Sequence, residues 1–238
     1  MKKLLIVSLA IFSALCSCNG NKTEKGENST KDTIKKSPQN IIRTPLQITS
    51  DFNQITSIGG IDIIYTQGDF SAELEGDSLL LPHIDVDIDS GILSISMKGE
   101  RNHDINIYEG KNGVKLYLSS PNLKCVALCS SGNFTSKGTW TNEDIQLGII
   151  GKGSFKLDSI NCKTFKYQTS GTGNADFKNI KGEQLEFICT SKSDVTATVD
   201  ADYLKAATNN GVITLNGKAR QKQLSASKDE LIKDNTTR

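Results

Sequence analysis

The sequence predicts an all-β protein, a right-handed parallel β-helix-like solenoid with a less regular β N-terminal part. A four-residue motif centred on glycine or serine recurs in the second half of the chain, at residues 131–134, 152–155, 172–175, 192–195 and 210–213. The last residues of these copies are separated by 21, 20, 20 and 18 positions. A nearly fixed period of this size indicates a solenoid whose copies stack on one another.

Apolar residues alternate with polar ones before each motif. Ile145 and Leu147 flank Gln146, for example, and the later copies repeat this order. Period-two alternation is typical of a strand with one buried face. A further apolar position recurs every 20 residues, as Trp140, Ile160 and Ile180. We therefore expect about three inward-pointing segments per copy, joined by bends at the glycines. An antiparallel sandwich with evenly spaced hairpins is the alternative.

The chain is expected to begin with a signal peptide, residues 1–17. Two lysines precede an apolar run that is too short to span a bilayer comfortably. Residues 15–18, Leu-Cys-Ser-Cys, resemble a bacterial lipobox, although Cys16 stands where alanine or serine is usual. This resemblance implies that Cys18 is the lipidated N-terminus, and several acyl chains would hold it firmly to a membrane. A plain secretory signal with two incidental cysteines is the alternative.

Residues 18–45 are expected to be a flexible tether after the lipidated cysteine. They are rich in Lys, Glu, Asn, Ser and Thr, and such a composition cannot form a packed core. Removal of residues 1–17 takes two of the 28 basic side chains, which leaves 26 against 27 acidic ones, a net charge of −1. A charge so near zero argues against nucleic-acid binding by broad electrostatic attraction.

Residues 46–220 are expected to form one head domain, long enough for a single sizeable core. Residues 46–120 read as its less regular part. Their clearest element is a hairpin in which strands at 84–88 and 93–97 are joined by a turn at Ser90-Gly91. The repeats occupy about 123–217, and residues 221–238 are interpreted as a polar tail.

Several short segments and a recurrent Ser-Gly-x-Gly motif indicate a family. The segments are residues 51–55, 93–95 and 119–123, while the motif is intact at 170–173 and has drifted in the other copies. In these features the chain resembles the bacterial putative auto-transporter adhesins with a head GIN domain, a domain of unknown function. The resemblance covers about residues 50–220. It implies a secreted or lipid-anchored β-helical protein and does not imply a known reaction.

Histidines and cysteines indicate no catalytic or metal centre in the sequence. His83 and His103 stand in no metal-ligand spacing with a cysteine, and neither has an identifiable triad partner. Cys125 and Cys129 lie four residues apart on one strand, roughly 13 Å at about 3.3 Å per residue, which exceeds disulfide reach. Cys189 falls in an inward column and reads as a small buried hydrophobe. We expect no structural disulfide, although the even number of cysteines leaves one possible.

Carboxylates are the remaining candidates for chemistry, because β-helical polysaccharide-degrading enzymes use clustered acids. The aspartates near the bends occupy different positions of the repeat and form no pair in one column; they are Asp158, Asp176, Asp194, Asp200 and Asp202. Asp85, Asp87 and Asp89 lie on one side of a strand, either as a solvated face or as calcium ligands. An envelope carbohydrate-active enzyme remains the alternative function, and it requires two carboxylates at about 5–10 Å.

The sequence therefore favours a non-catalytic cell-envelope lipoprotein, adhesin-like, that presents a solenoid surface to a glycan or an envelope protein. It is expected to need no cofactor, to bind no nucleic acid and to reach the membrane through the lipid on Cys18. The outer membrane is the expected location, with the head facing the periplasm or the surface. Candidate contact residues on the polar outer faces are Lys166, Gln168, Asn174 and Lys178.

Overall fold

A computed structural model describes residues 40–48, 51–97 and 113–238. The expected signal peptide, the lipidation site Cys18 and His103 lie outside these residues. One 16-stranded sheet holds all the strands, accompanied by two short 3₁₀ turns, η1 (Leu81–His83) and η2 (Asp229–Leu231). Within the described ranges, no helix has the length and hydrophobicity that a membrane span requires.

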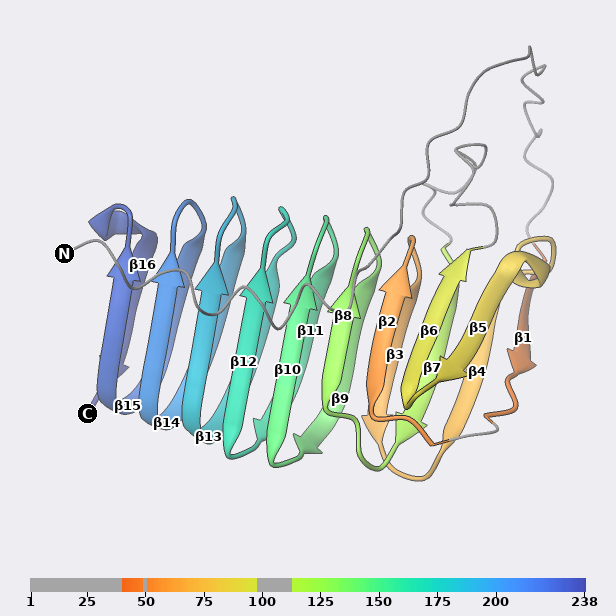
Figure 1. The fold of residues 1–238 in the computed structure, drawn as a ribbon, viewed down its shortest axis with the longest axis horizontal. Coiled ribbons are helices and arrows are strands. Elements are labelled where there is room, and N and C mark those ends of the chain that lie inside the picture. Colours follow the sequence, from red (N-terminus) through yellow and green to blue (C-terminus); the bar gives the residue numbers. More distant parts are fainter. Residues whose placement is uncertain (1–39, 49–50, 98–112) are drawn as a thin grey trace, which may run out of the picture. The chain divides into compact units, whose positions relative to one another are not determined.

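The second half of the chain is a regular parallel solenoid (Figure 1). We call one circuit of the chain a rung. Face 1 consists of β8 (Cys125–Leu128), β10 (Asp144–Ile149), β12 (Thr164–Thr169) and the second halves of β13 (Ala175–Cys189), β14 (Asp194–Thr208) and β15 (Val212–Ala226). Face 2 consists of β9 (Asn133–Thr141), β11 (Ser154–Asn161), the first halves of β13 to β15, and β16 (Ile232–Thr237). A register shift interrupts face 2 where β9 pairs with β11 and where β13 pairs with β14. The recurrent apolar position after it, Trp140, Ile160 and Ile180, is buried, as predicted.

The stacking of equivalent positions decides between the two predicted architectures. Phe155 pairs with Ala175, Ala175 with Val195, and Val195 with Ile213, all in parallel register. These four residues therefore form one row along the solenoid, and all of them are buried. The parallel solenoid is confirmed, and an antiparallel sandwich is wrong for the repeats.

The less regular N-terminal part continues the same solenoid. Strands β2 (Gln54–Ile58) and β3 (Asp62–Gln67) form a rung that pairs in parallel with β8 and β9. Strands β6 (Ile92–Met97) and β7 (Lys115–Ser120) form the next rung outward, on the other side of β2 and β3. The rung formed first in the sequence thus lies between two rungs formed later.

Antiparallel strands complete this end of the solenoid. They are β1 (Ile41–Pro45), β4 (Ser71–Asp77) and β5 (Ile84–Asp89). The predicted hairpin is confirmed: β5 pairs antiparallel with β6, and Ser90 and Gly91 both have positive φ, 52° and 78°. Two central residues with positive φ define the type I′ turn that suits the twist of a hairpin.

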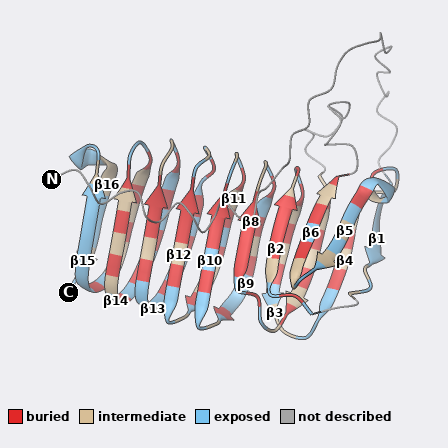
Figure 2. Ribbon diagram, viewed as in Figure 1, coloured by how far each residue is buried: buried red, intermediate tan, exposed pale blue. Residues whose placement is uncertain are grey.

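A continuous core runs through the solenoid between the two faces. Buried positions alternate with less buried ones along the strands and line up between neighbours (Figure 2). Aromatic rings from successive rungs touch at centroid separations between 5.1 and 6.1 Å, in a chain that includes Tyr65, Phe134, Trp140 and Phe155. The buried polar atoms of two of these rings have partners, because Trp140 Nε1 donates to the Leu123 carbonyl at 3.0 Å and the Tyr65 hydroxyl to the Ser120 carbonyl at 2.9 Å.

The recurrent glycines mark a corner where successive rungs approach very closely. A Cβ at Gly153 would lie 2.3 Å from the Gly132 carbonyl oxygen, and a Cβ at Gly173 would lie 1.8 Å from the Gly153 carbonyl oxygen. Neither distance leaves room for a carbon atom. The motif is therefore required by contact between neighbouring backbones, with the glycine of one rung lying against that of the next.

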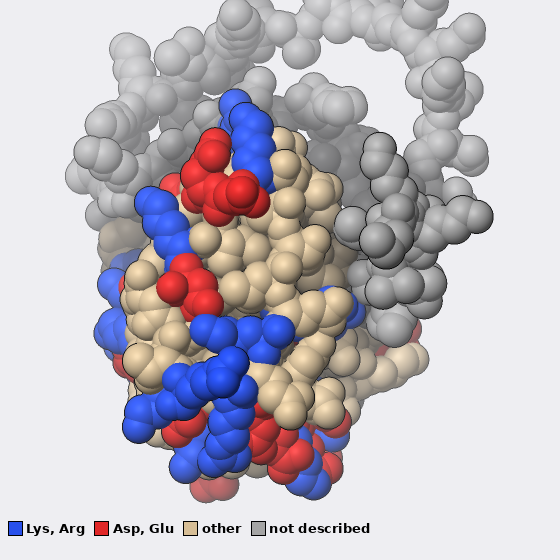
Figure 3. All heavy atoms as spheres, turned by 90° about the vertical axis from the view of Figure 1, so that its left-hand side faces the viewer, with Lys and Arg blue, Asp and Glu red and all other residues tan. Residues whose placement is uncertain are grey.

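The C-terminal end of the solenoid finishes on charged side chains. Residues 221–226 form the end of β15 and 232–237 form β16, so both segments add to the last rung. Its inward positions include Lys222, whose Nζ lies 2.7 Å from Asp234 Oδ2 and 2.9 Å from Thr236 Oγ1. Leu204 and Leu215 occupy the equivalent positions one rung earlier. Figure 3 views this end, where basic and acidic side chains lie next to one another.

Candidate functional site

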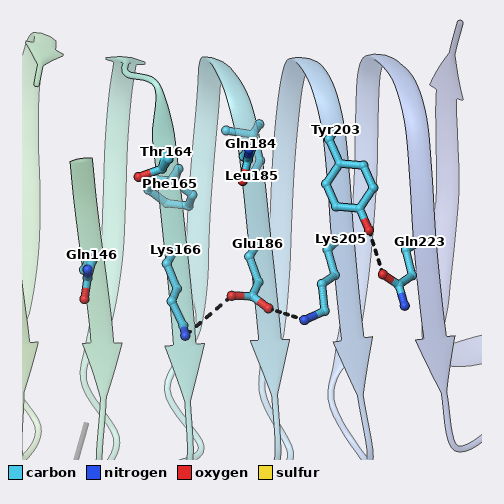
Figure 4. A pocket seen from close by; sticks show the side chains of 10 residues that line it. All are labelled: Gln146, Thr164, Phe165, Lys166, Gln184, Leu185, Glu186, Tyr203, Lys205 and Gln223. Atoms are coloured by element: carbon cyan, nitrogen blue, oxygen red, sulfur yellow. Dashed lines mark hydrogen bonds and ion pairs between the residues drawn. The ribbon is translucent and has the colours of Figure 1, made fainter. Parts of the chain in front are cut away.

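A polar groove crosses face 1 on its outer side (Figure 4). Its volume is about 440 Å³, and it crosses strands β10 to β15. Along each strand the inward residues are apolar, so their polar neighbours point outward into the groove. Ten residues line it: Gln146, Thr164, Phe165, Lys166, Gln184, Leu185, Glu186, Tyr203, Lys205 and Gln223.

One row of outward side chains runs along the middle of the groove. The strand register pairs Gln146 with Lys166, Lys166 with Glu186, Glu186 with Lys205, and Lys205 with Gln223. Neighbouring strands lie about 4.8 Å apart, so the row repeats a polar group at that interval. We call these five residues the polar row.

The charges of the polar row neutralise one another only in part. Glu186 Oε1 lies 2.6 Å from Lys205 Nζ, and Glu186 Oε2 lies 3.5 Å from Lys166 Nζ. Burial tends to raise the pKa of Glu186, but the two ammonium groups outweigh it and hold this pKa below its ordinary value. Glu186 is therefore a carboxylate at neutral pH, and two cations share its single negative charge.

Neutral hydrogen-bonding groups surround the charged centre of the groove. The Tyr203 hydroxyl donates to Gln223 Oε1 at 2.6 Å, and the Tyr203 ring is partly exposed beside the row (Figure 4). Gln146 and Gln184 contribute amides, each of which can both donate and accept hydrogen bonds. The groove thus combines an aromatic surface with groups suited to hydroxyl-rich ligands.

Residues 51–177, more than half of the chain, match the family described as "putative auto-transporter adhesin, head GIN domain". The chain belongs to this family. Its membership confirms the resemblance seen in the sequence and makes the protein adhesin-like, which indicates a place in the cell envelope or at the cell surface. None of the curated proteins compared with the chain matches it.

Two solved structures have the same fold as this GIN-domain protein. One is described as a putative adhesin from Bacteroides fragilis NCTC 9343, with 18% identity, a TM-score of 0.62, and coverage of 79% of this chain and 93% of that one. The other is described as a putative adhesin from Parabacteroides distasonis ATCC 8503, with 13% identity, a TM-score of 0.65, and coverage of 80% and 95%. At this identity the likeness establishes the fold alone.

The contact residues suggested by the sequence do not all lie in the groove of this GIN domain. Lys166 belongs to the polar row, and Gln168, which follows it on the same side of β12, is buried. Asn174 lies at the glycine corner, where its Oδ1 accepts from the Asp194 amide at 3.0 Å. Lys178 lies on face 2, with its Nζ 2.6 Å from Asp158 Oδ1.

Sequence reasoning missed most of the groove. It did not select Glu186, Lys205, Tyr203 or Gln223, because these residues are spread over three copies of the repeat. One signal could have identified these residues. It is the outward-facing position two residues after the start of each face 1 strand. Extended across all copies, that position gives the polar row.

Burial keeps three thiols of the GIN domain protonated at neutral pH. Cys189 lies in the inward column with Ile149 and Thr169, as predicted. Burial raises the pKa of Cys189 and of Cys125 to about 11 and that of Cys162 to about 12. None of these three cysteines forms a disulfide.

The other candidates for chemistry lie apart from the groove. His83 is exposed at the end of η1. Asp85, Asp87 and Asp89 lie on the exposed side of β5, as expected. Among the residues that the structure describes, no three His, Cys, Asp or Glu side chains gather in a way that could hold a metal ion.

Proposed function

We propose that this GIN-domain protein is a non-catalytic cell-envelope lipoprotein, anchored through Cys18, that binds a glycan chain along the groove of face 1. The family supports the adhesin-like class and the envelope location. The groove supports the ligand class, and the Leu-Cys-Ser-Cys segment supports the anchor. The outer membrane is the proposed location.

The observation that carries the proposal is the polar row itself. Five successive strands each present one polar side chain at the same position, so the surface repeats at the strand spacing. A repetitive surface suits an extended, repetitive polymer better than a compact small molecule. Amides, a tyrosine ring and charged groups are the side chains that can hold hydroxyl-rich sugar units in place.

The competing function is that of a carbohydrate-active enzyme. Such enzymes place two carboxylates about 5–10 Å apart, one of them with a raised pKa so that it can donate a proton. Among the ten groove-lining residues Glu186 is the only carboxylate, and its pKa is lowered. The groove therefore favours binding over hydrolysis.

A glycan panel tests the proposal. The chain beginning at Asn19 should bind at least one polysaccharide, and Tyr203→Ala and Lys205→Ala should each weaken that binding about tenfold. Lys178→Ala is the matched control, because it removes a lysine from a surface ion pair on face 2. Equal loss in the control would contradict the assignment to the groove. Release of new reducing ends would favour the enzyme, and retention of an envelope protein without glycan binding would favour a protein partner.

Metabolic labelling with a radioactive fatty acid tests the anchor separately. The wild-type protein and Cys16→Ser should both incorporate the label, whereas Cys18→Ser should not. Label in all three, or in none, would refute lipidation at Cys18.

A further inference from the structure

Strand β1 is attached to the edge of the sheet in an unusual way. It pairs antiparallel with β4 over five residues, Ile41 to Pro45, and all five are exposed. Ile41 and Ile42 are 49% and 37% exposed, so even the large apolar side chains add little to the core. Since burial of apolar surface is the main source of strand stability, β1 resembles a peptide bound to an edge more than a strand of the fold.

Backbone hydrogen bonds and one arginine hold β1 in place. The ladder is extended at its ends by the Ser78 amide, which donates to the Asn40 carbonyl, and by the Leu46 amide, which donates to the Ala72 carbonyl, both at 2.9 Å. Arg43 supplies the side-chain contacts: its Nη2 lies 2.6 Å from Glu75 Oε2 and its Nη1 lies 3.4 Å from Glu73 Oε2.

The arginine also contacts the next strand. Its guanidinium carbon lies 4.6 Å from the centroid of the Tyr117 ring on β7. A guanidinium held by carboxylates on one side and an aromatic ring on another is a specific recognition arrangement.

The outer side of β4 presents three carboxylates to β1, which has only one basic residue. Glu73, Glu75 and Asp77 all point to the same side of this strand and face Pro45, Arg43 and Ile41 respectively. Only the central position of β1 is basic. Lys115 of β7 lies 2.8 Å from Glu75, so Arg43 and Lys115 both pair with the same central carboxylate. Across the ladder the two flanking carboxylates face a proline and an isoleucine; Glu73 has the longer 3.4 Å contact with Arg43, and Asp77 Oδ1 accepts from the Leu79 amide at 2.9 Å.

We propose that the outer edge of β4 is a binding site for an extended basic peptide, and that β1 is its weak resident occupant. The partner is a segment with a central arginine and further basic residues two positions to either side, which would face all three carboxylates. Main-chain hydrogen bonds provide affinity in this mode, and alternate side chains provide selectivity. This inference is independent of the groove and of its ligand.

The covalent link between β1 and the head explains why a weak occupant stays bound. A tethered segment competes at an effective concentration in the millimolar range, so a free peptide displaces it only when the peptide binds more tightly. Leu46 and Ile48 pack against the core, which places the point of detachment between them and β1. The edge is protected from chance pairing while β1 is bound.

Hydrogen exchange on the full-length protein tests whether β1 opens alone. Amides of residues 41–44 should exchange well before those of β14, and Arg43→Ala should speed them about fivefold further without changing β14. Arg220→Ala is the matched control, because it removes an arginine from an exposed ion pair with Asp202 at the opposite end of the solenoid. Exchange of β1 only together with β14 would overturn the proposal.

Peptide binding tests the site directly. The probe is a fluorescent peptide of residues 40–46 in which Ile41→Lys and Pro45→Lys add two positive charges. It should bind the Arg43→Ala protein about fivefold more tightly than the Arg220→Ala protein, the factor by which loss of Arg43 favours the open form of β1, and a peptide with Arg43→Glu should not bind. The opposite change, Ile41→Lys in the protein, should slow exchange of β1 and exclude the peptide. Equal binding to both arginine variants, or to neither, would overturn the proposal.

Discussion

A very close contact between neighbouring rungs gives a demanding test of the fold. Replacement of Gly173 by alanine would place a Cβ 1.8 Å from the Gly153 carbonyl oxygen, 2.9 Å from its carbon and 3.1 Å from Ile149 Cγ2. A carbon and an oxygen without a bond between them need more than 3 Å, so the two backbones must separate by more than 1 Å (about 1.4 Å). Flexible side chains cannot absorb this change, since the nearest atoms are main chain.

The expected loss of stability follows from that displacement. Overpacking usually costs about 1–3 kcal/mol, and a forced shift of two paired backbones belongs at or above the upper limit, about 3 kcal/mol. For a domain of this size each kcal/mol lowers the melting temperature by about 2–4 °C, which predicts a fall of roughly 6–12 °C. Circular dichroism during heating and in urea measures both quantities.

Gly60→Ala is the control for the same corner. A Cβ there would meet only Ser131 Oγ, at 3.5 Å, which is an ordinary contact. Its free energy of unfolding should stay within about 0.5 kcal/mol of wild type. If Gly173→Ala proved as stable as Gly60→Ala, the close approach of the rungs at this corner would be refuted.

Three further predictions concern single side chains. Ser136 is buried and its hydroxyl has no hydrogen-bond partner, so Ser136→Ala should leave urea stability unchanged or raise it by about 1 kcal/mol; a loss above that size would contradict this. Burial raises the pKa of Asp234, but hydrogen bonds from Lys222 and Thr236 outweigh it and leave the folded pKa below the ordinary value of 3.8. Its stabilising effect is therefore present above pH 4 and lost as the pH falls further, so wild type should be more stable than Asp234→Asn at pH 7 and lose that advantage by about pH 2; a constant difference would refute it. Cys189 is buried with a pKa of about 11, so iodoacetamide at pH 8 should label it only at the rate of unfolding, and rapid labelling of the folded protein would contradict its position.

The regular half of the fold was predictable because its signals are local. The glycine corner, the strand alternation and the turn at Ser90-Gly91 each depend on a few adjacent residues. Stacking then follows, since one rung alone cannot bury its apolar side chains. The same residues could not show that β6 pairs with β2 and β7 with β3, because these pairings join positions about 40 to 50 residues apart.

The candidate sites were less predictable for a related reason. Glu186 is an ordinary surface residue until its register with Lys166 and Lys205 is known. Likewise, residues 41–45 lie in a polar segment whose composition indicates a tether, and they become a strand only because the edge of β4 is available. Both sites depend on pairings between distant parts of the chain, and no local pattern records these.

The position of the β2–β3 rung has a consequence for the order in which the chain can fold. As the chain emerges from its N-terminus, this segment appears first, yet both of its neighbours, β6–β7 and β8–β9, are made later. One of its edges stays unpaired until residue 120 has emerged and the other until residue 141, and unpaired edges invite aggregation. After that point, each new rung pairs with the exposed edge of a rung that has already been made. The early segment is therefore the part of the fold most open to aggregation, and each later rung can pair with a rung that is already complete.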